Sequence, residues 1–251
     1  MKAIRFITIG LILGGTAFAA STTELYTEQA YLAREARYQG NLRVRQDLAV
    51  TQFLYPYLQA GGELITALDN TTQPAGGSHV FAGPGVRLRY EFASLYVEPR
   101  VRQSLTSGPN NTSLDFRSLV VLGKLWVTPV APPLSTLVEA YSETLLTSYD
   151  KWNVIEAAYL RGGFRYGLGS ATFADLFLEP FVTLDRHGYH YNNRADLKLS
   201  ARFETLVEGL KLSLTGSLLA NTYLNGRITG GNPYADRTMG FRLLAVVGGV
   251  W

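Results

Sequence analysis

Along much of the chain, apolar and polar side chains alternate residue by residue. The clearest stretch runs over 194–205, where Ala195 and Leu197 alternate with Asp196 and Lys198. Successive side chains of a β-strand point to opposite faces, whereas a helix would scatter these charges around its circumference. The period of two therefore predicts a strand with one apolar and one ionic face.

The same alternation recurs through the rest of the chain. The segments on either side of this strand follow it closely, although Phe177 and Phe181 lie on the polar parity. The spacing suits transmembrane strands of about 9–11 residues with extensions beyond the bilayer. We expect about twelve strands, near residues 22–35, 41–51, 54–68, 79–91, 93–105, 112–127, 134–147, 152–166, 171–185, 193–206, 209–224 and 236–251.

The connections between these strands alternate in length. Short ones are expected near Phe53, Phe92, Val130 to Pro133, Gly169 and Glu208, and the others are rich in Gly, Asn and Pro, as turn chemistry requires. The longer set comprises 69–78, 107–112, 186–193 and 225–237, with two shorter members near Gln39 and Asp150. In bacterial barrels the short turns are periplasmic. The pattern predicts an all-β, transmembrane, antiparallel up-and-down β-barrel with both termini in the periplasm.

The N-terminus reads as a secretory signal peptide. Lys2 and Arg5 form a positive region, an apolar stretch follows, and Ala17-Phe18-Ala19 offers a small-x-small cleavage site. The apolar run is shorter than the roughly 20 residues that a membrane helix requires. We therefore expect residues 1–19 to be the signal peptide and 20–251 to form a single barrel domain.

Composition excludes some other classes. Removing Lys2 and Arg5 from 23 basic residues leaves 21 against 20 acidic ones, so the surplus of clustered cations expected of a nucleic-acid binder is missing. No cysteine is present, so disulfides contribute nothing to stability. No run after the signal is apolar enough for a membrane helix.

The strands of a soluble antiparallel sandwich, or of a lipocalin-like barrel, would also show alternating apolar and polar residues. The apolar parity is rich in Ala and Gly as well as Leu, which suits a lipid-facing surface better than an interlocked core. Aromatic residues near segment ends are consistent with interfacial girdles: Tyr55, Tyr57, Tyr90, Trp126, Tyr141, Trp152, Tyr166 and Tyr223. Four residues fit poorly: Glu156 lies on the apolar parity, and Pro84, Pro99 and Pro180 remove donors from strands that should have two neighbours.

If the apolar parity faces lipid, the ionic parity lines the interior. The candidate lumen-lining residues are Arg87, Arg89, Glu98, Arg100, Arg102, Arg117, Glu139, Glu143, Arg161, Arg165, Asp175, Glu179, Arg194, Asp196, Lys198, Arg202, Glu204 and Arg242, together with Arg43, Arg45, Asp47, Glu63, Glu91, Asp115 and Lys211. One interpretation is that Arg-carboxylate ladders brace neighbouring strands. The other is a polar conduit whose Arg-rich strands, especially 87–102, attract anionic or sugar solutes. About eight strands are filled by side chains and about sixteen leave a pore, so a twelve-stranded barrel lies between.

Catalysis finds little support in the sequence. The three histidines are His79, His187 and His190, and the last two lie in an expected loop without a nucleophile at fixed spacing. The same pair lacks a convincing third and fourth metal ligand. We expect neither an enzyme nor a cofactor or metal site.

The final strand places Phe241 and Trp251 on one parity. A last strand that ends in an aromatic residue resembles the C-terminal insertion signal of outer-membrane β-barrels, with Trp in place of the usual Phe. The resemblance implies location in the bacterial outer membrane, contact with its lipid, and recognition by the barrel-insertion machinery.

Three C-terminal motifs carry a more specific resemblance: 177–186, Tyr191 to Asp196, and Gly231 to Asp236. They resemble the terminal barrels of surface-polysaccharide secretion and phage-adsorption proteins, which implies polysaccharide export with periplasmic secretion partners. The Arg clusters also resemble those of small porins for acidic oligosaccharides. We therefore expect a narrow channel or export conduit for polysaccharide or small anionic or sugar solutes. The alternative is a structural or adhesion barrel with a plugged lumen and recognition by loops 69–78, 186–193 and 225–237.

Overall fold

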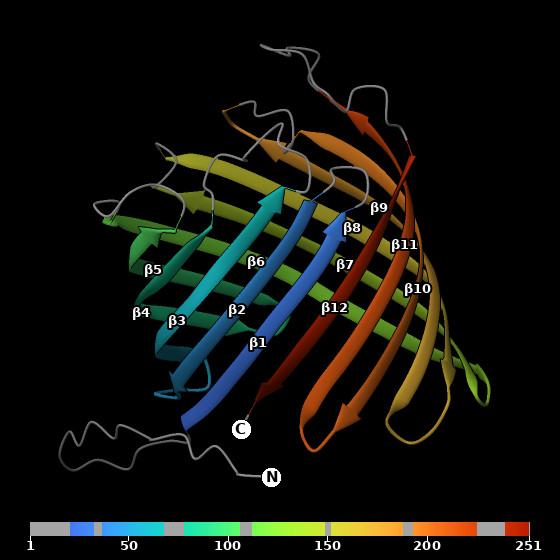
Figure 1. Ribbon diagram of the computed structural model, residues 1–251. Helices are drawn as coiled ribbons and strands as arrows, with labels where there is room; N and C mark the ends of the chain where they lie inside the picture. Colours follow the sequence, from blue (N-terminus) through green and yellow to red (C-terminus); the bar gives the residue numbers. More distant parts are fainter. Residues whose placement is uncertain are drawn as a thin grey trace, which may run out of the picture.

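The computed structural model describes residues 21–32, 37–67, 78–105, 112–148, 152–187, 193–224 and 239–250. In these residues each strand pairs antiparallel with its sequence neighbours, and the first strand pairs with the last, so the sheet closes into a barrel (Figure 1). The predicted closed, antiparallel, twelve-stranded barrel is confirmed. The strands are β1 (Ser21–Leu32), β2 (Arg37–Leu48), β3 (Leu54–Ala67), β4 (His79–Tyr90), β5 (Ala93–Ser104), β6 (Thr112–Ala131), β7 (Leu134–Thr147), β8 (Asn153–Gly167), β9 (Thr172–Asp185), β10 (Arg194–Val207), β11 (Leu210–Tyr223) and β12 (Met239–Val250).

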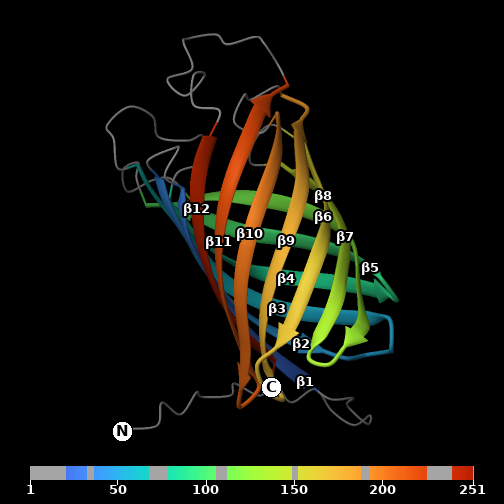
Figure 2. The same ribbon diagram turned by 90° about the vertical axis from the view of Figure 1, so that its right-hand side faces the viewer.

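The two ends of the barrel differ. The short connections, the start of β1 and the end of β12 lie at one end, which we call the turn end (Figures 1 and 2). The connections at the opposite, loop end fall largely outside the described residues. In the two-residue turn between β10 and β11, Glu208 (φ 50°) and Gly209 (φ 84°) both adopt the left-handed backbone that a type I′ hairpin turn requires.

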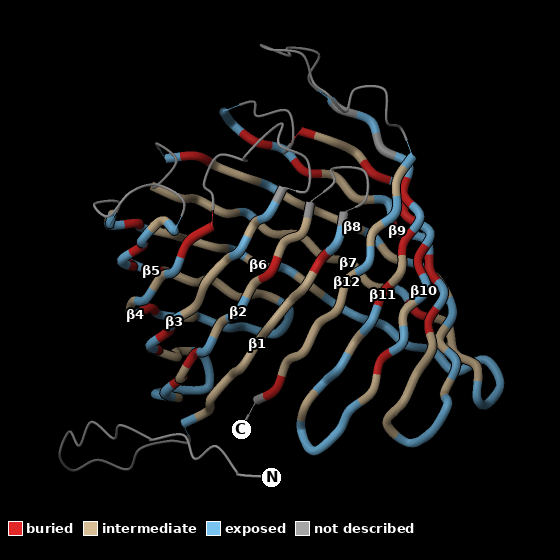
Figure 3. The backbone as a smooth tube through the Cα atoms, in the orientation of Figure 1, coloured by how far each residue is buried: buried red, intermediate tan, exposed pale blue. Residues whose placement is uncertain are grey.

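Burial alternates from residue to residue along strands such as β9 and β10 (Figure 3), as expected when successive side chains point into and out of the barrel. On β10, Asp196 and Lys198 are buried, whereas Leu197 and Leu199 are 48% and 49% exposed. An apolar outer surface around a polar interior reverses the arrangement of a soluble sandwich, so that alternative is wrong. A closed barrel with this polarity has the architecture of transmembrane β-barrels, which leave no backbone edge unpaired in hydrocarbon. Among the described residues, no helix is long and apolar enough to cross a membrane.

The prolines interrupt hydrogen bonding without shifting the strands. Between β4 and β5 the paired residues stop at Ala82 and Val101 and resume at Val86 and Val97 in the same register. Pro84 and Pro99, which have no N–H to donate, lie opposite each other in that gap. A second gap, between β8 and β9, contains Pro180.

Several sequence-based expectations are wrong in detail. Glu91 was expected to line the interior, but it lies in the β4–β5 turn with a φ of 44°. Gln39 was expected in a connection, but it lies on β2, where its amide donates to Glu63 at 2.9 Å. Both differences follow from misplaced strand ends, since β4 ends one residue earlier and β2 begins four residues earlier than expected, and end residues carry the weakest alternation.

The aromatic residues divide between the two faces. Tyr90, Trp126 and Tyr166 are exposed on the outer face toward the turn end, as an interfacial girdle requires, and Trp152 packs on Phe116 near the loop end with ring centroids 6.0 Å apart. The expectation is wrong for three tyrosines that share the inward parity of charged residues, namely Tyr55, Tyr57 and Tyr141. The side chain of Tyr223 lies outside the described part of the chain.

Glu156 is exposed on the outer parity, as expected from its place among apolar residues. It is the fourth residue of β8, near the loop end, where strands extend toward water. Phe241 is also exposed on the outer parity, near the start of β12. The expected signal peptide, residues 1–19, and Trp251 lie outside the described residues.

Candidate functional site

Strand pairing places the candidate residues on the inward parity of the barrel. These residues are Arg87, Arg89, Glu98, Arg100, Arg102, Arg117, Glu139, Glu143, Arg161, Arg165, Asp175, Glu179, Arg194, Asp196, Lys198, Arg202, Glu204 and Arg242. The expected acids and bases thus face a shared interior. On β1 the acids Glu24 and Glu28, which also face inward, were missed, because the outer parity of that strand contains Thr23, Thr27 and Gln29 and its alternation is faint.

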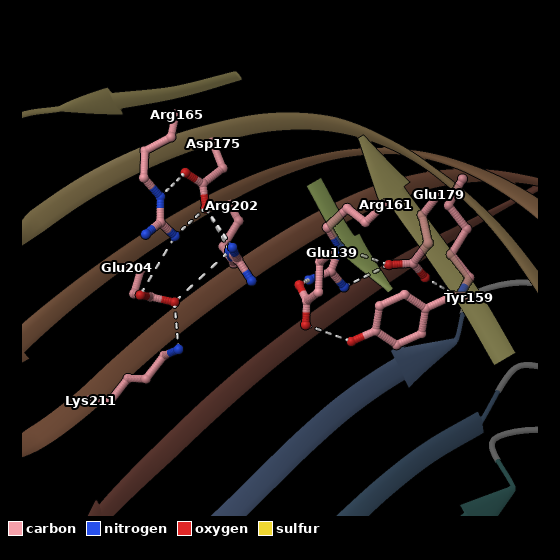
Figure 4. Close-up of polar contacts among 10 residues, drawn as sticks. Glu139, Tyr159, Arg161, Arg165, Asp175, Glu179, Arg202, Glu204 and Lys211 are labelled. Carbon is pink, nitrogen blue, oxygen red and sulfur yellow. Dashed lines mark hydrogen bonds and ion pairs between the residues drawn. The ribbon is translucent and has the colours of Figure 1, made fainter. Parts of the chain in front are cut away.

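The first cluster spans β7 to β10 around Arg161 (Figure 4). Its guanidinium donates to Glu139 at 2.5 Å and to Glu179 at 2.6 Å, and Lys198 donates to the other oxygen of Glu179 at 2.7 Å. The hydroxyl of Tyr159 donates to Glu139 at 2.9 Å. One chain of hydrogen bonds therefore ties four consecutive strands together.

The second cluster (Figure 4) comes from residues closer to the turn end of β8 to β11. Arg165 forms a bidentate pair with Asp175, at 2.8 Å and 3.0 Å, and Arg202 donates to the same carboxylate at 2.6 Å. The Lys211 ammonium forms an ion pair with a carboxylate oxygen of Glu204 at 2.8 Å. The Asp175 side chain is completely buried, so its charge depends on the two guanidiniums that enclose it.

Aromatic rings separate the cations of these clusters. The rings of Tyr141 and Tyr159 stack with centroids 5.0 Å apart, and the Arg161 guanidinium lies 4.8 Å from Tyr159 and 4.4 Å from Phe177. The Arg202 guanidinium lies 5.4 Å from the centroid of the same Phe177 ring. Each guanidinium is thus held by a carboxylate at its edge and a ring at its face, which fixes its orientation.

A third cluster fills the interior beside β2 to β5. Arg45 pairs with Glu24 and, at 2.9 Å, with Asp47, and Asp47 also binds Arg87 at 2.8 Å. The Arg45 guanidinium lies 5.6 Å from the ring of Tyr96, which is three strands away on β5. Since Arg45 is only 2% exposed, this half of the interior is packed with side chains.

Two glycines on β4 make that packing possible. A Cβ on Gly85 would collide with the ring of Tyr57, and one on Gly83 would lie 2.8 Å from the Cα of Arg100. Tyr57 on β3 therefore reaches over β4, and its hydroxyl donates to Glu98 on β5 at 2.7 Å. Nearer the loop end, Arg100 donates to Asp115 at 2.8 Å.

A cavity of about 170 Å³ lies on the other side of the interior. Its charged lining comes from β8 to β10, and the next two strands of the sheet, β11 and β12, continue the same wall. The lining residues are Arg161, Phe177, Glu179, Lys198, Ser200, Arg202, Glu204, Lys211, Ser213, Thr215, Ser217, Arg242, Leu244 and Val246. Sequence reasoning did not select the hydroxyls or Leu244 and Val246, because it selected charge alone. Their inward parity could be read from Lys211 and Arg242 on the same strands.

Chemically, the arrangement favours passage or binding of a polar solute. Charges of both signs alternate and are paired, so the interior presents hydrogen-bonding groups with little net field. Among the described residues, no group of three or more His, Cys, Asp or Glu side chains could hold a metal ion. His79 contacts Arg102 at 3.0 Å, His187 lies after β9, and His190 is outside the described chain.

No known family matches the sequence, and no curated protein is significantly similar to it. Several solved structures share its outline. A bacterial polysaccharide outer membrane secretin is 11% identical, with 92% of this chain and 98% of that chain covered and a TM-score of 0.49. The β domain of the Bordetella autotransporter BrkA is 12% identical, with 91% of this chain and 98% of that chain covered and a TM-score of 0.49. The NanC porin is 8% identical, with 90% of this chain and 98% of that chain covered and a TM-score of 0.39. At these values the likeness extends to the barrel fold alone.

Proposed function

We propose that this bacterial outer-membrane β-barrel is a narrow conduit for polar solutes of the sugar or polysaccharide class. The observation that carries the proposal is the cavity of about 170 Å³ inside the barrel, which is bordered by paired charges, hydroxyls and three apolar side chains. A barrel that needed only mechanical strength could fill this space as it fills the space beside β2 to β5. In the proposed orientation the turn end and both termini lie in the periplasm.

The cellular setting follows from the same proposal. Residues 1–19 would direct export and be removed, and the barrel-insertion machinery would recognise the last strand through Phe241 and Trp251. If the solute is a polysaccharide, separate periplasmic secretion proteins would deliver it to the turn end. Anionic solutes are less favoured than the Arg clusters alone suggested, because the arginines of β8 to β10 have carboxylate partners at hydrogen-bonding distance.

A structural or adhesion barrel is the second candidate, and the packed half of the interior favours it. Arg45, Tyr57 and Glu98 are each 3% exposed or less. In that case the cavity would be a closed pocket, and the loop end would recognise a partner.

Planar-bilayer recording with the purified, refolded barrel distinguishes the conduit from the structural or adhesion barrel. A conduit gives stable current steps, and Ser213→Trp reduces them because the indole would occupy the cavity. Leu214→Trp is the matched control, since Leu214 is the next residue of β11 and is 49% exposed on the outer face. Absence of steps from correctly folded protein would overturn the conduit and support the structural barrel.

A further inference from the structure

The wall formed by β11 and β12 differs from the rest of the interior. Lys211, Ser213, Thr215 and Ser217 follow one another on the inward parity of β11. Directly opposite on β12 are Val246, Leu244 and Arg242, which face Ser213, Thr215 and Ser217 respectively. The result is a track with hydroxyls along one side, aliphatic groups along the other, and one cation at each end.

We infer that this track binds the transported solute, and that the solute is an uncharged carbohydrate chain; the inference rests on the proposed conduit. The length of the track supports an extended ligand. Lys211 and Ser217 are six residues apart on β11, and a strand rises about 3.3–3.4 Å per residue, so the track is roughly 20 Å long. A sugar chain presents hydroxyls along its edges and C–H groups on its ring faces, which matches the two sides of the track.

Charge pairing argues against an acidic ligand. Of the cations that border the cavity, Lys211 binds Glu204 at 2.8 Å, Lys198 binds Glu179 at 2.7 Å, and Arg202 binds Asp175 at 2.6 Å. An acidic sugar would have to compete with these carboxylates and would bring its own charge near them. A neutral chain needs only hydrogen bonds and aliphatic contact.

Because side chains fill the interior beside β2 to β5, the track on β11 and β12 is the expected route for a solute. Gln59 on β3 is 5% exposed and lies in the cluster beside β2 to β5, whereas Ser213 and Val246 are half-buried and border the cavity. A solute that crosses the barrel therefore meets β11 and β12. Ser213 and Val246 are neighbours on adjacent strands of this wall, so one residue from each row of the track can be probed at the same level of the barrel.

The natural sequence has no cysteine, so single thiols can test the route directly. We would introduce Ser213→Cys, Val246→Cys and, as the matched buried control, Gln59→Cys, and treat folded protein in detergent with a charged methanethiosulfonate reagent. Rapid reaction at Ser213→Cys and Val246→Cys, with Gln59→Cys slower by at least about tenfold, is expected. Equal reaction at Gln59→Cys would overturn the route. This readout does not require conductance, so it separates failure of the track from failure of the conduit.

The ligand class is tested by current block. Maltohexaose, a neutral glucose oligomer, is expected to block the channel at lower concentration than an oligogalacturonate of equal length. Ser213→Ala should weaken the block by maltohexaose roughly two- to tenfold, the usual effect of one hydrogen bond. Block by the acidic oligomer at lower concentration, or unchanged maltohexaose block in Ser213→Ala, would overturn the assignment.

Discussion

The hydroxyl of Tyr57 on β3 and the carboxylate of Glu98 on β5 are joined by a 2.7 Å hydrogen bond that passes over β4. The intervening residue beneath the tyrosine ring is Gly85, where any Cβ would meet the ring atoms. The two strands are thus coupled through the interior as well as through the sheet.

Gly85→Ala should destabilise the barrel. The added methyl group must displace the Tyr57 ring, and overpacking of this kind costs about 1–3 kcal/mol. The measurement is urea-induced unfolding in lipid vesicles, followed by tryptophan fluorescence. Gly162→Ala is the control, because a Cβ there meets nothing within 4 Å. If both variants unfold at the same urea concentration, the packed half of the interior is incorrectly described.

Removing the charge of Asp175 should be costly. Asp175→Asn leaves Arg165 and Arg202 without their shared, fully buried carboxylate, and loss of one member of a buried ion pair typically costs about 3–5 kcal/mol. Glu28→Gln is the comparison, since the Glu28 pair with Arg242 spans 3.6 Å and is partly exposed, and such pairs contribute at most about 1 kcal/mol. Unfolding midpoints in the same vesicles check both. Equal losses would contradict the proposed bracing role of the second cluster.

Ion selectivity should be weak in the natural protein and should change when one acid is neutralised. Paired charges predict similar permeability for K⁺ and Cl⁻. Glu204→Gln removes the partner of Lys211, and a unit charge at a few ångströms in water is worth on the order of 1 kcal/mol, so Cl⁻ permeability relative to K⁺ should rise about fivefold. The reversal potential in a KCl gradient reports this ratio. Strong anion selectivity before mutation would contradict the paired description.

A charge placed on the outer surface should cost more near the middle of the barrel than near the loop end. Leu199 lies beside Leu178 and Leu218, with its side chain outward, and Leu199→Arg should destabilise the folded state by about 2–4 kcal/mol, the usual range at the bilayer midplane. Glu156→Arg, at a position that already carries a charge, should change stability by at most about 1 kcal/mol. Equilibrium folding into vesicles measures both. Similar effects at the two positions would argue against a hydrocarbon-facing surface at Leu199.

The alternating pattern was sufficient to predict the barrel where both faces of a strand are chemically distinct, as on β10. It failed to locate Glu24 and Glu28 because Thr and Gln on the outer parity of β1 resemble an inward face. It also misplaced Tyr57 and Tyr141, since a tyrosine suits either an interfacial girdle or a polar interior.

The division of the interior could not be predicted. It depends on contacts between strands that are not neighbours, such as Arg45 with Tyr96 at 5.6 Å, and on glycines that permit a ring to cross a strand. Parity specifies which side a residue faces, but not how far its side chain reaches. The hydroxyl track was overlooked because serines and threonines carry no charge, so in the sequence they were treated only as the polar residues that alternate with leucines.

The seam between β1 and β12, where Leu25 lies opposite Gly249, brings together the two ends of the described chain. Until the last strand has been synthesised and has reached the first, two rows of backbone donors and acceptors have no partners, and hydrocarbon offers them none. Insertion of the closed barrel into the membrane therefore requires that the chain include every strand through β12. A polypeptide that stops short of β12 should remain outside the bilayer, where it is available to proteases, whatever the quality of its remaining strands.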